Sequence, residues 1–251
     1  MTITMKQECN EMAGCGAATA WGADAFFTKA HFQLLEELMY PKKAKAGEYL
    51  FWEGDATGKL YYVRSGSVKV TKTTEDGKTV NLTIQRRGDL LGELGMTGSD
   101  MYDYSAVLLE DGEFGVIQEK DLEILLHRHG DFAVAFTKWM ALQHRTTQSK
   151  FRDLLLFGKP GALASTLIRL CNTCGVVTKD GIRLTIKLTN TELAEFIGAT
   201  RESVNRMLSD LKADDIIEIE GGCITVKSLN RLKAICQCPS FPACPREICR
   251  I

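Results

Sequence analysis

The sequence predicts an α+β protein in which an antiparallel β-barrel of jelly-roll type is followed by a long helix and a winged helix-turn-helix. Three patterns predict this order. Short runs rich in β-branched and aromatic residues, separated by glycine-containing turns, fill residues 45–117, as in barrels and jelly rolls. Apolar residues recur at helical spacing over 120–157. Two short helical patterns and a hairpin pattern then fill 188–226.

These patterns divide the chain into five parts. They are an N-terminal extension at 1–28, the barrel at 29–119, the long helix at 120–157, the winged helix-turn-helix at 158–230 and a cysteine-rich tail at 231–251. The sequence GKPG at 158–161 ends the long helix, because glycine and proline interrupt a helical pattern. Pro160 suits the first turn of the next helix, where its missing N–H group has no helical partner.

The long helix carries an apolar stripe. Its residues are Phe132, Phe136, Trp139 and Leu142. The same side turns polar from His144 and becomes apolar again at Phe151. A helix this long with one apolar side usually needs a partner helix. We therefore predict that the stripe is the seam of a homodimer.

Bulk composition restricts the possible function classes. The net charge of −1 excludes a polybasic coat but allows a local basic face. The first residues contain no apolar core of a signal peptide, and no stretch approaches the roughly 18 apolar residues of a membrane span. We therefore expect a cytoplasmic protein without a membrane segment. Nine cysteines in a reducing compartment indicate metal binding or redox chemistry rather than a disulfide framework.

The most informative stretch is LTNTELAEFIGATRESVNRMLSDLKADDIIEIEGGCITV at 188–226. Asn190 can cap a first helix, Gly198 permits a sharp turn, and Thr200 can cap a second helix. At helical spacing the second helix has two distinct faces. The polar face holds Arg201, Glu202, Asn205 and Arg206, and the apolar face holds Val204, Met207, Leu208 and Leu211.

The polar residues of this second helix are of types that read bases. Arginine can bridge two acceptors of guanine, and glutamate can accept from cytosine. Thr200 and Ser203, at the helix N-terminus, can contact phosphate. The next segment turns at Gly221–Gly222 and predicts a hairpin wing. The stretch therefore predicts a DNA-binding protein. Because no nucleophile and base are paired by any motif, we do not expect an enzyme.

Three motifs resemble the cyclic-AMP receptor protein/Fnr superfamily of bacterial transcription regulators. They are RESVNRML at 201–208, SKFRDLLLFGKPGALASTLIRL at 149–170 and CPREIC at 244–249. The last two look like the Gram-positive branch of Fnr. The resemblance implies a cyclic-nucleotide-binding-like barrel, a homodimer and a transcription activator that contacts RNA polymerase. It also implies a two-fold operator with TGTGA-like half-sites, read by Arg201, Glu202 and Arg206.

The barrel departs from the cyclic-AMP branch of this superfamily. That branch carries a Gly-Glu-Leu turn and, shortly after it, an Arg-Ser pair whose arginine neutralises the cyclic phosphate. Here Gly92, Glu93 and Leu94 match the turn, but Tyr104-Ser105 stands at the Arg-Ser position. A buried phosphate without a cation is costly. We therefore expect no cyclic nucleotide and regard Glu93 as a structural remnant.

Five cysteines outside the tail give weak signals. Cys171 and Cys174 complete an apolar helical stripe and are best explained as core residues. Cys223 lies in the predicted wing and is expected to be inert. Cys9 and Cys15 stand in a segment that supplies no third cysteine, so they do not match the N-terminal cluster motif of the enteric branch of Fnr.

The tail gives a stronger signal. Its end, CQCPSFPACPREICRI at 236–251, contains four cysteines, and proline follows two of them. Short cysteine spacings with a Cys-Pro step are typical of iron–sulfur sites. Proline also stiffens the loop and removes backbone donors.

The resemblance to Gram-positive Fnr implies what this tail holds. In that branch three C-terminal cysteines and an aspartate bind a [4Fe–4S] cluster. The matching residues are Cys244, Cys249 and Asp153, with Cys238 as first choice for the third thiolate and Cys236 as the alternative. The implied function is an oxygen-responsive regulator of anaerobic metabolism that is active while its cluster is intact.

Two alternatives stay open. The same fold could carry a zinc site or a thiol–disulfide switch, because four cysteines suffice for tetrahedral zinc. The protein could instead bind a small-molecule effector and carry an incidental tail.

Overall fold

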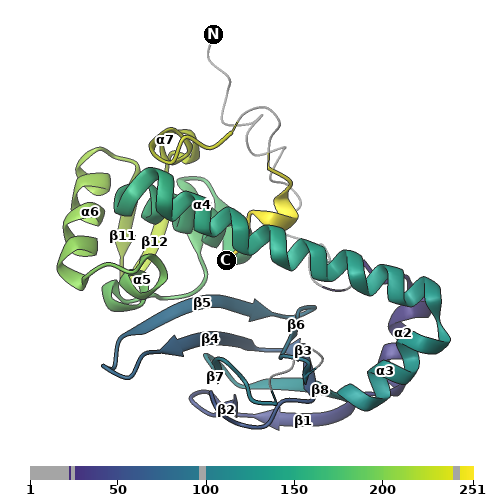
Figure 1. Ribbon diagram of the computed structural model, residues 1–251. Coiled ribbons are helices and arrows are strands. Elements are labelled where there is room, and N and C mark those ends of the chain that lie inside the picture. The colour runs from purple at the N-terminus through teal and green to yellow at the C-terminus, as the bar shows by residue number, and fades with distance from the viewer. Residues whose placement is uncertain (1–22, 24–25, 96–99, 240–243) are drawn as a thin grey trace. The chain divides into compact units, whose positions relative to one another are not determined.

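The computed structural model describes residue 23 and residues 26–95, 100–239 and 244–251 (Figure 1). Cys9 and Cys15, of the predicted N-terminal extension, lie outside these ranges. The described chain forms two compact units, Ala20–Leu142 and Gln143–Ile251. Helix α4, Gly130–Cys174, begins in the first unit and ends in the second. The five-part division by sequence stays a prediction.

The first unit contains two four-stranded sheets whose strands pair in antiparallel fashion. One has the order β1-β8-β3-β6 and the other β2-β7-β4-β5. The strands are β1 Tyr40–Ala44, β2 Tyr49–Phe51, β3 Lys59–Ser65, β4 Ser67–Thr73, β5 Thr79–Arg86, β6 Leu90–Leu91, β7 Ser105–Leu108 and β8 Gly112–Gln118.

The two sheets form a sandwich rather than the predicted closed barrel. In the described residues, the first and last strands of each sheet do not pair with each other, so neither sheet closes into a barrel. Apolar side chains from both sheets meet in one shared core, for example Val63 and Phe114 from one sheet and Val68 and Ala106 from the other. The strands are short, so two stacked layers already bury their apolar faces. The jelly-roll-like, mixed α and β class predicted by the sequence is confirmed.

A second core in this unit corrects two predictions about the long helix. The structure ends α3, Glu119–Arg128, at the non-helical residue His129 and starts α4 at Gly130, so 120–157 is not one helix. Phe132, Phe136 and Trp139 are buried beside α2, Lys29–Glu37, and the sandwich. This stripe is therefore core and not an exposed dimer seam. Helical periodicity identified an apolar side but did not show what covers it.

Helix α4 is broken at Gly158, inside the predicted GKPG boundary. Gly158 has φ 60° and ψ −164°, a non-helical conformation that glycine adopts at little cost. The segments on either side, ending at Phe157 and starting at Lys159, are thus two helices joined by a kink. The full α4 is long and apolar enough to cross a membrane, which the sequence inspection did not predict. However, 61% of its most apolar window is buried inside the protein, as in a core helix of a soluble protein.

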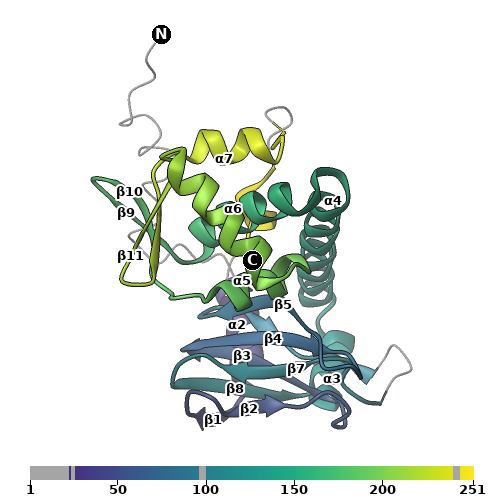
Figure 2. The same cartoon turned by 90° about the vertical axis from the view of Figure 1, so that its left-hand side faces the viewer.

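The second unit carries the helix-turn-helix and a four-stranded sheet of order β11-β12-β10-β9 (Figure 2). Its elements after α4 are β9 Gly175–Thr178, β10 Gly181–Leu184, α5 Asn190–Ile197, α6 Arg201–Ala213, β11 Ile217–Glu220, β12 Cys223–Val226, α7 Leu229–Ile235 and the 3-10 helix η3 Arg246–Ile248. The sequence did not predict the β9–β10 hairpin. Cys171 and Cys174 are buried in α4, as predicted.

Candidate functional site

The helix-turn-helix is built from α5 and α6, joined by a turn at Gly198. Gly198 is left-handed, with φ 57°, and its N–H closes α5 on the Ala194 carbonyl. The first helix is capped by Thr189 and not, as predicted, by Asn190. The Thr189 hydroxyl accepts from the N–H of Glu192, whose carboxylate accepts from the Thr189 N–H, a capping box. The box fixes α5, so the turn that follows it has a defined direction.

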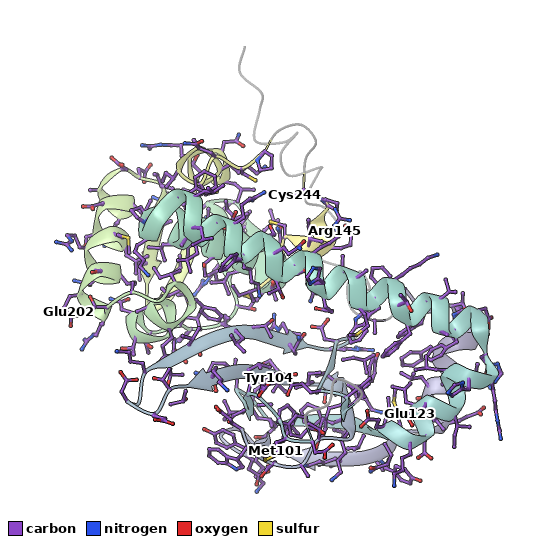
Figure 3. The ribbon with its side chains drawn as sticks, viewed as in Figure 1. Met101, Tyr104, Glu123, Arg145, Glu202 and Cys244 are labelled. Atoms are coloured by element: carbon purple, nitrogen blue, oxygen red, sulfur yellow. The ribbon has the colours of Figure 1, made fainter. Side chains whose placement is uncertain are left out.

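The second helix, α6, has the two faces that the sequence predicted. Val204, Leu208 and Leu211 are its buried residues. The Thr200 hydroxyl caps the helix by accepting from the Ser203 N–H at 3.2 Å. The predicted base-reading residues Arg201, Glu202, Asn205 and Arg206 are all exposed, and Glu202 points outward from α6 in Figure 3.

Asn205, one of the predicted DNA contacts, makes a hydrogen bond within the helix-turn-helix. The Asn190 side-chain amide donates to the Asn205 Oδ1 at 3.1 Å, linking α5 to α6. Asn205 is therefore a brace between the two helices as well as an exposed polar residue. Arg201, Glu202 and Arg206 carry the stronger prediction for base contact.

The wing is the hairpin of β11 and β12. Gly221 and Gly222 form its turn with φ values of 57° and 80°, the positive pair that a type I′ hairpin turn requires. Strand β12 also pairs with β10, so the wing is the edge of a sheet and not an isolated hairpin. Cys223 starts β12 and is half-buried.

The sandwich retains the turn that the sequence compared with cyclic-nucleotide sites. The Glu93 carboxylate accepts from the Asp103 N–H at 2.7 Å. Burial raises the pKa of Glu93, with the nearby Asp103 charge adding to the rise. Tyr104 packs against the core inside the sandwich, with its ring 5.7 Å from that of Phe51 (Figure 3). Its hydroxyl is hydrogen-bonded to the Gly92 backbone. A tyrosine thus stands beside the turn where a phosphate-binding site would need a cation.

Asp153 lies near the end of the first segment of α4 and is buried, with 4% of its surface exposed. Its Oδ1 accepts from the Arg152 Nε at 3.0 Å. Its Oδ2 accepts from the Arg169 Nη2 at 2.8 Å and from the Ser165 hydroxyl. Burial opposes ionisation, but the hydrogen bonds from Ser165, Arg169 and Arg152 outweigh it and lower the pKa of Asp153. The site therefore holds a carboxylate and not a carboxylic acid.

The tail cysteines meet around this carboxylate. Cys236 and Cys238 share a hydrogen bond, and both respond to the charge of Asp153. Cys244 is paired electrostatically with Arg152, and it lies beside α4 in Figure 3. Cys249 responds to both Cys238 and Cys244. Cys236 and Cys238 thus interact with Asp153, more than eighty residues away in the sequence, and Cys244 interacts with Arg152, the residue before it.

The two candidates for the third thiolate differ. Cys236 is buried at the end of α7, and its sulfur lies 3.7 Å from the Lys233 carbonyl oxygen. The hydrogen bond from Cys236 lowers the pKa of Cys238 to about 6, despite opposing burial, with Lys233 also contributing. The same bond, together with burial, raises the pKa of Cys236. The contact between Cys236 and Cys238 thus favours ionisation of the Cys238 thiol and opposes ionisation of the Cys236 thiol.

The donor set is compatible with an iron–sulfur cluster. Among the described residues, no three His, Cys, Asp or Glu side chains gather closely enough to hold one metal ion. A single zinc needs its ligands at one centre, whereas the ligands of a four-iron cluster bind separate irons. The thiols of Cys238, Cys244 and Cys249 are of the donor type that such clusters use.

The sequence did not predict three residues that organise this region. Arg169 and Ser165 hold the Asp153 carboxylate. Lys159, directly after the kink, donates to the carbonyl oxygens of Ile197 at 2.8 Å and of Gly198, at the turn of the helix-turn-helix. The available signal for Arg169 was a charged residue inside the apolar run STLIRLC. A long-range contact partner cannot be read from that signal.

Comparisons with known proteins agree with this architecture. Residues 41–129 match the cyclic nucleotide-binding domain family, and residues 161–235 match the Crp-like helix-turn-helix domain family. Two solved structures show the same fold. FixK2 from Bradyrhizobium japonicum has a TM-score of 0.68 at 18% identity, covering 78% of this chain and 96% of that one. CooA from Carboxydothermus hydrogenoformans has a TM-score of 0.68 at 20% identity, covering 80% and 89%.

Curated relatives are transcription regulators rather than enzymes, which confirms that prediction. The "Anaerobic regulatory protein" of Bacillus subtilis is 45% identical over 222 residues, which cover 88% of this chain and 92% of the relative. The "CRP-like cAMP-activated global transcriptional regulator" of Mycobacterium tuberculosis is 27% identical, covering 79% and 88%. The chain therefore belongs to the Crp/Fnr family and is a DNA-binding transcription regulator of that type.

Proposed function

We propose that this protein is an oxygen-responsive regulator of anaerobic metabolism that binds its operator while a [4Fe–4S] cluster is intact. The observation that supports the proposal is that tail cysteines interact with the ionised Asp153 and with the neighbouring Arg152, near the end of the first segment of α4. The similarity to a Bacillus subtilis protein named an anaerobic regulatory protein supports it.

The proposed ligands are Cys238, Cys244, Cys249 and Asp153. Cys238 is preferred over Cys236 because Cys236 is buried against the last turn of α7. When bound, the cluster supplies a group that oxygen can oxidise or destroy. An aspartate is a harder ligand than a thiolate and binds soft iron–sulfur centres less firmly.

The contacts of Asp153 support Oδ1 as the oxygen that would bind a metal. Its Oδ2 is held by Arg169 and Ser165, both buried. Its Oδ1 is held by Arg152, whose side chain is 37% exposed. A metal that binds Oδ1 therefore displaces a surface arginine and leaves the buried contacts in place. Arg152 also neighbours Cys244, so it can compensate thiolate charge in this region.

We further propose a homodimer formed along α4, through the later part of the predicted stripe, where it becomes apolar again at Phe151, together with Met140. Met140, Phe151 and Leu155 are exposed by 47%, 63% and 64%. Their spacings of eleven and four residues put them on one face of a helix. Large apolar side chains exposed in a line are typical of a surface that packs against another helix. A second copy of α4 is the occupant that the operator symmetry requires.

The DNA contact follows from the exposed face of α6. In a dimer the two α6 helices would enter successive major grooves of a two-fold operator. Arg201, Glu202 and Arg206 would read bases of TGTGA-like half-sites, with Thr200 and Ser203 on phosphate. RNA polymerase is the proposed partner for activation. We propose no cyclic nucleotide, because Tyr104 stands where a phosphate would need a cation.

We propose that the cluster site at Asp153 and the recognition helix α6 are connected through the kink at Gly158. Lys159 follows Gly158 directly and holds the carbonyl oxygens at the α5–α6 turn. A change in how the tail and Asp153 hold the end of the first α4 segment would therefore reach the recognition helix through one lysine. This is a shift between two poses of the DNA-binding part and needs no chemistry on a substrate.

Anaerobic purification tests the proposal. The protein should be brown, with about four irons and about four acid-labile sulfides per chain, and should footprint a two-fold operator only before exposure to air. Cys249→Ser and Asp153→Ala should lower cluster content, while the control Cys223→Ser in the wing should retain it. A colourless protein with one zinc per chain would favour the zinc alternative, and operator binding that depends on an added small molecule would favour an effector-binding regulator.

A further inference from the structure

Arg169 is the most completely bonded charged side chain of the second unit's core. It lies in the second segment of α4, and only 3% of its surface is exposed. Every N–H group of its guanidinium has an acceptor. The Nε donates to the Ser165 hydroxyl at 3.2 Å, Nη1 to the backbone carbonyls of Ile248 at 2.8 Å and Arg250 at 3.4 Å, and Nη2 to the Ser149 hydroxyl at 2.8 Å and Asp153 at 2.8 Å.

These acceptors come from three different segments of the chain. Ser149 and Asp153 precede the kink at Gly158, Ser165 follows it, and Ile248 and Arg250 belong to the tail. One planar, rigid group thus joins the end of the first α4 segment, the start of the DNA-binding part and the end of the chain. A lysine has a single donor atom and cannot hold acceptors on both edges of such a fork.

Two further side chains of α4 hold the same end of the tail. The Asn172 amide donates to the Cys249 carbonyl at 2.8 Å. The Thr173 hydroxyl accepts from the Ile251 N–H at 3.0 Å. Asn172 and Thr173 follow Arg169 by three and four residues, about one helical turn, so all three lie on the same side of the helix.

Most contacts of residues 248–251 with this side of the helix do not use a sulfur atom; the exception is the Cys249 thiol, which is hydrogen-bonded to the Asn172 side chain. The other contacts are made by backbone groups of the tail, and the side chains of Ile248 and Ile251 are buried, with 6% and 7% of their surfaces exposed. Buried apolar area and backbone hydrogen bonds are the ordinary means of holding a terminal segment in place. The placement of Cys249 therefore follows chiefly from backbone bonds and buried neighbours, and its own thiol adds one bond to Asn172.

We propose that Arg169 is a positioning residue that docks residues 248–251 on α4 independently of the tail thiols, and so holds Cys249 and Asp153 at the same place. The docking stands without the cluster. The statement that it prepares two cluster ligands rests on the proposed function. The consequence is that loss of the cluster frees only the loop around Cys238 and Cys244, while the chain end stays attached to the DNA-binding part.

Hydrogen exchange of the full-length, chelator-treated protein, read by mass spectrometry, tests the docking. We expect that the triple variant C238S/C244S/C249S keeps the backbone N–H of Ile251 protected, as in the unaltered chain. Arg169→Gln should make the C-terminal peptide exchange roughly tenfold faster or more, because opening becomes local. Arg145→Gln, an exposed arginine of the same helix, is the matched control and should change nothing.

Two results would overturn the proposal. One is a C-terminal peptide that stays protected in Arg169→Gln, and the other is protection that disappears in the triple cysteine variant. If Arg169→Gln does not fold, Arg169→Lys keeps the charge beside Asp153 but not the fork, and faster exchange at Ile251 is again the expected result. An unchanged exchange rate in Arg169→Lys, with a native circular dichroism spectrum, would contradict the proposal.

Iron content separates the docking from the proposed cluster. After anaerobic reconstitution, Arg169→Lys should bind less iron and sulfide than the Arg145→Gln control. If neither protein binds iron but the exchange results hold, the docking is right and the cluster proposal is wrong. If both bind equal amounts of iron, Arg169 does not position the ligands.

Discussion

Two regions of this protein each contain a carboxylate, and its surroundings shift its pKa in opposite directions. In the sandwich, burial raises the pKa of Glu93, and the nearby core is aromatic, with Tyr104 at the Gly92 turn. In the second unit, burial also opposes the ionisation of Asp153, but hydrogen bonds from Ser165 and two arginines lower its pKa. A carboxylate becomes a usable ligand where its charge is supported. The comparison favours the tail over the sandwich as the place of the proposed sensing chemistry.

The largest expected effect separates these two carboxylates directly. Asp153→Ala removes the only carboxylate that the structure shows paired with the buried Arg169. Breaking one partner of a buried ion pair typically costs about 3–5 kcal/mol, so the free energy of unfolding of the cluster-free protein should fall by about that amount. Urea denaturation measures it. Glu93→Ala is the matched variant in the sandwich, and an equal loss there would refute the contrast.

DNA reading should depend on neither carboxylate. Arg206→Ala removes an exposed base-reading candidate of α6 and should weaken operator binding by about 1–3 kcal/mol while relaxing specificity at one base pair. Titration of labelled operator and a single-mismatch set measures both effects. Lys43→Ala, which removes an exposed positive charge of the sandwich, serves as the control. Arg206 is not a base-reading residue if the affinity for all sequences falls equally.

A smaller effect tests whether Tyr104 is part of the scaffold. Tyr104→Phe removes the hydroxyl that is bonded to the Gly92 backbone and should lower the free energy of unfolding by about 1 kcal/mol. Cluster content and operator affinity should stay unchanged, because the proposed sensing site lies at the tail and not in the sandwich. Calorimetry with cyclic AMP should show no binding to either protein. Saturable binding of cyclic AMP to the unaltered chain would indicate that the sandwich senses a signal.

The smallest effect is a pH dependence at Glu93. Its folded pKa is raised, so the fold is destabilised by the ionised form once the pH rises through that pKa, and not at pH values below the unfolded pKa. Glu93→Gln should therefore be slightly more stable than the unaltered chain at about pH 8 and equal to it at about pH 4. Urea curves at both values measure the difference. A larger advantage at the lower pH would contradict this sign.

Much of the fold was predictable because its signals are local. The capping threonine and the alternation of faces defined α6, and the Gly221–Gly222 pair defined the wing turn. The kink at Gly158 lay inside a GKPG sequence that interrupts any helix. The cap of α5 was misplaced by one residue, onto Asn190 instead of Thr189, because both residue types can cap a helix.

The main wrong prediction concerns which part of the molecule packs against a helix. The stripe with Phe132 and Trp139 was correctly identified as apolar but was assigned to a partner helix, whereas α2 and the sandwich cover it within the chain. The break at His129 stands directly before Gly130, but a single glycine inside a helical pattern is often tolerated, so it did not predict a break. The β9–β10 hairpin was missed because its strands are only four residues each.

By itself the sequence determined the order of elements, the two faces of α6, the kink and the set of tail cysteines, because each depends on neighbours within a few residues. The tertiary structure decided which face of α4 is free, which carboxylate is held ionised and how the chain end is fixed. Arg169 shows the reason. Its acceptors lie up to 81 residues away, and a buried cation is stable only where the folded chain brings such acceptors together.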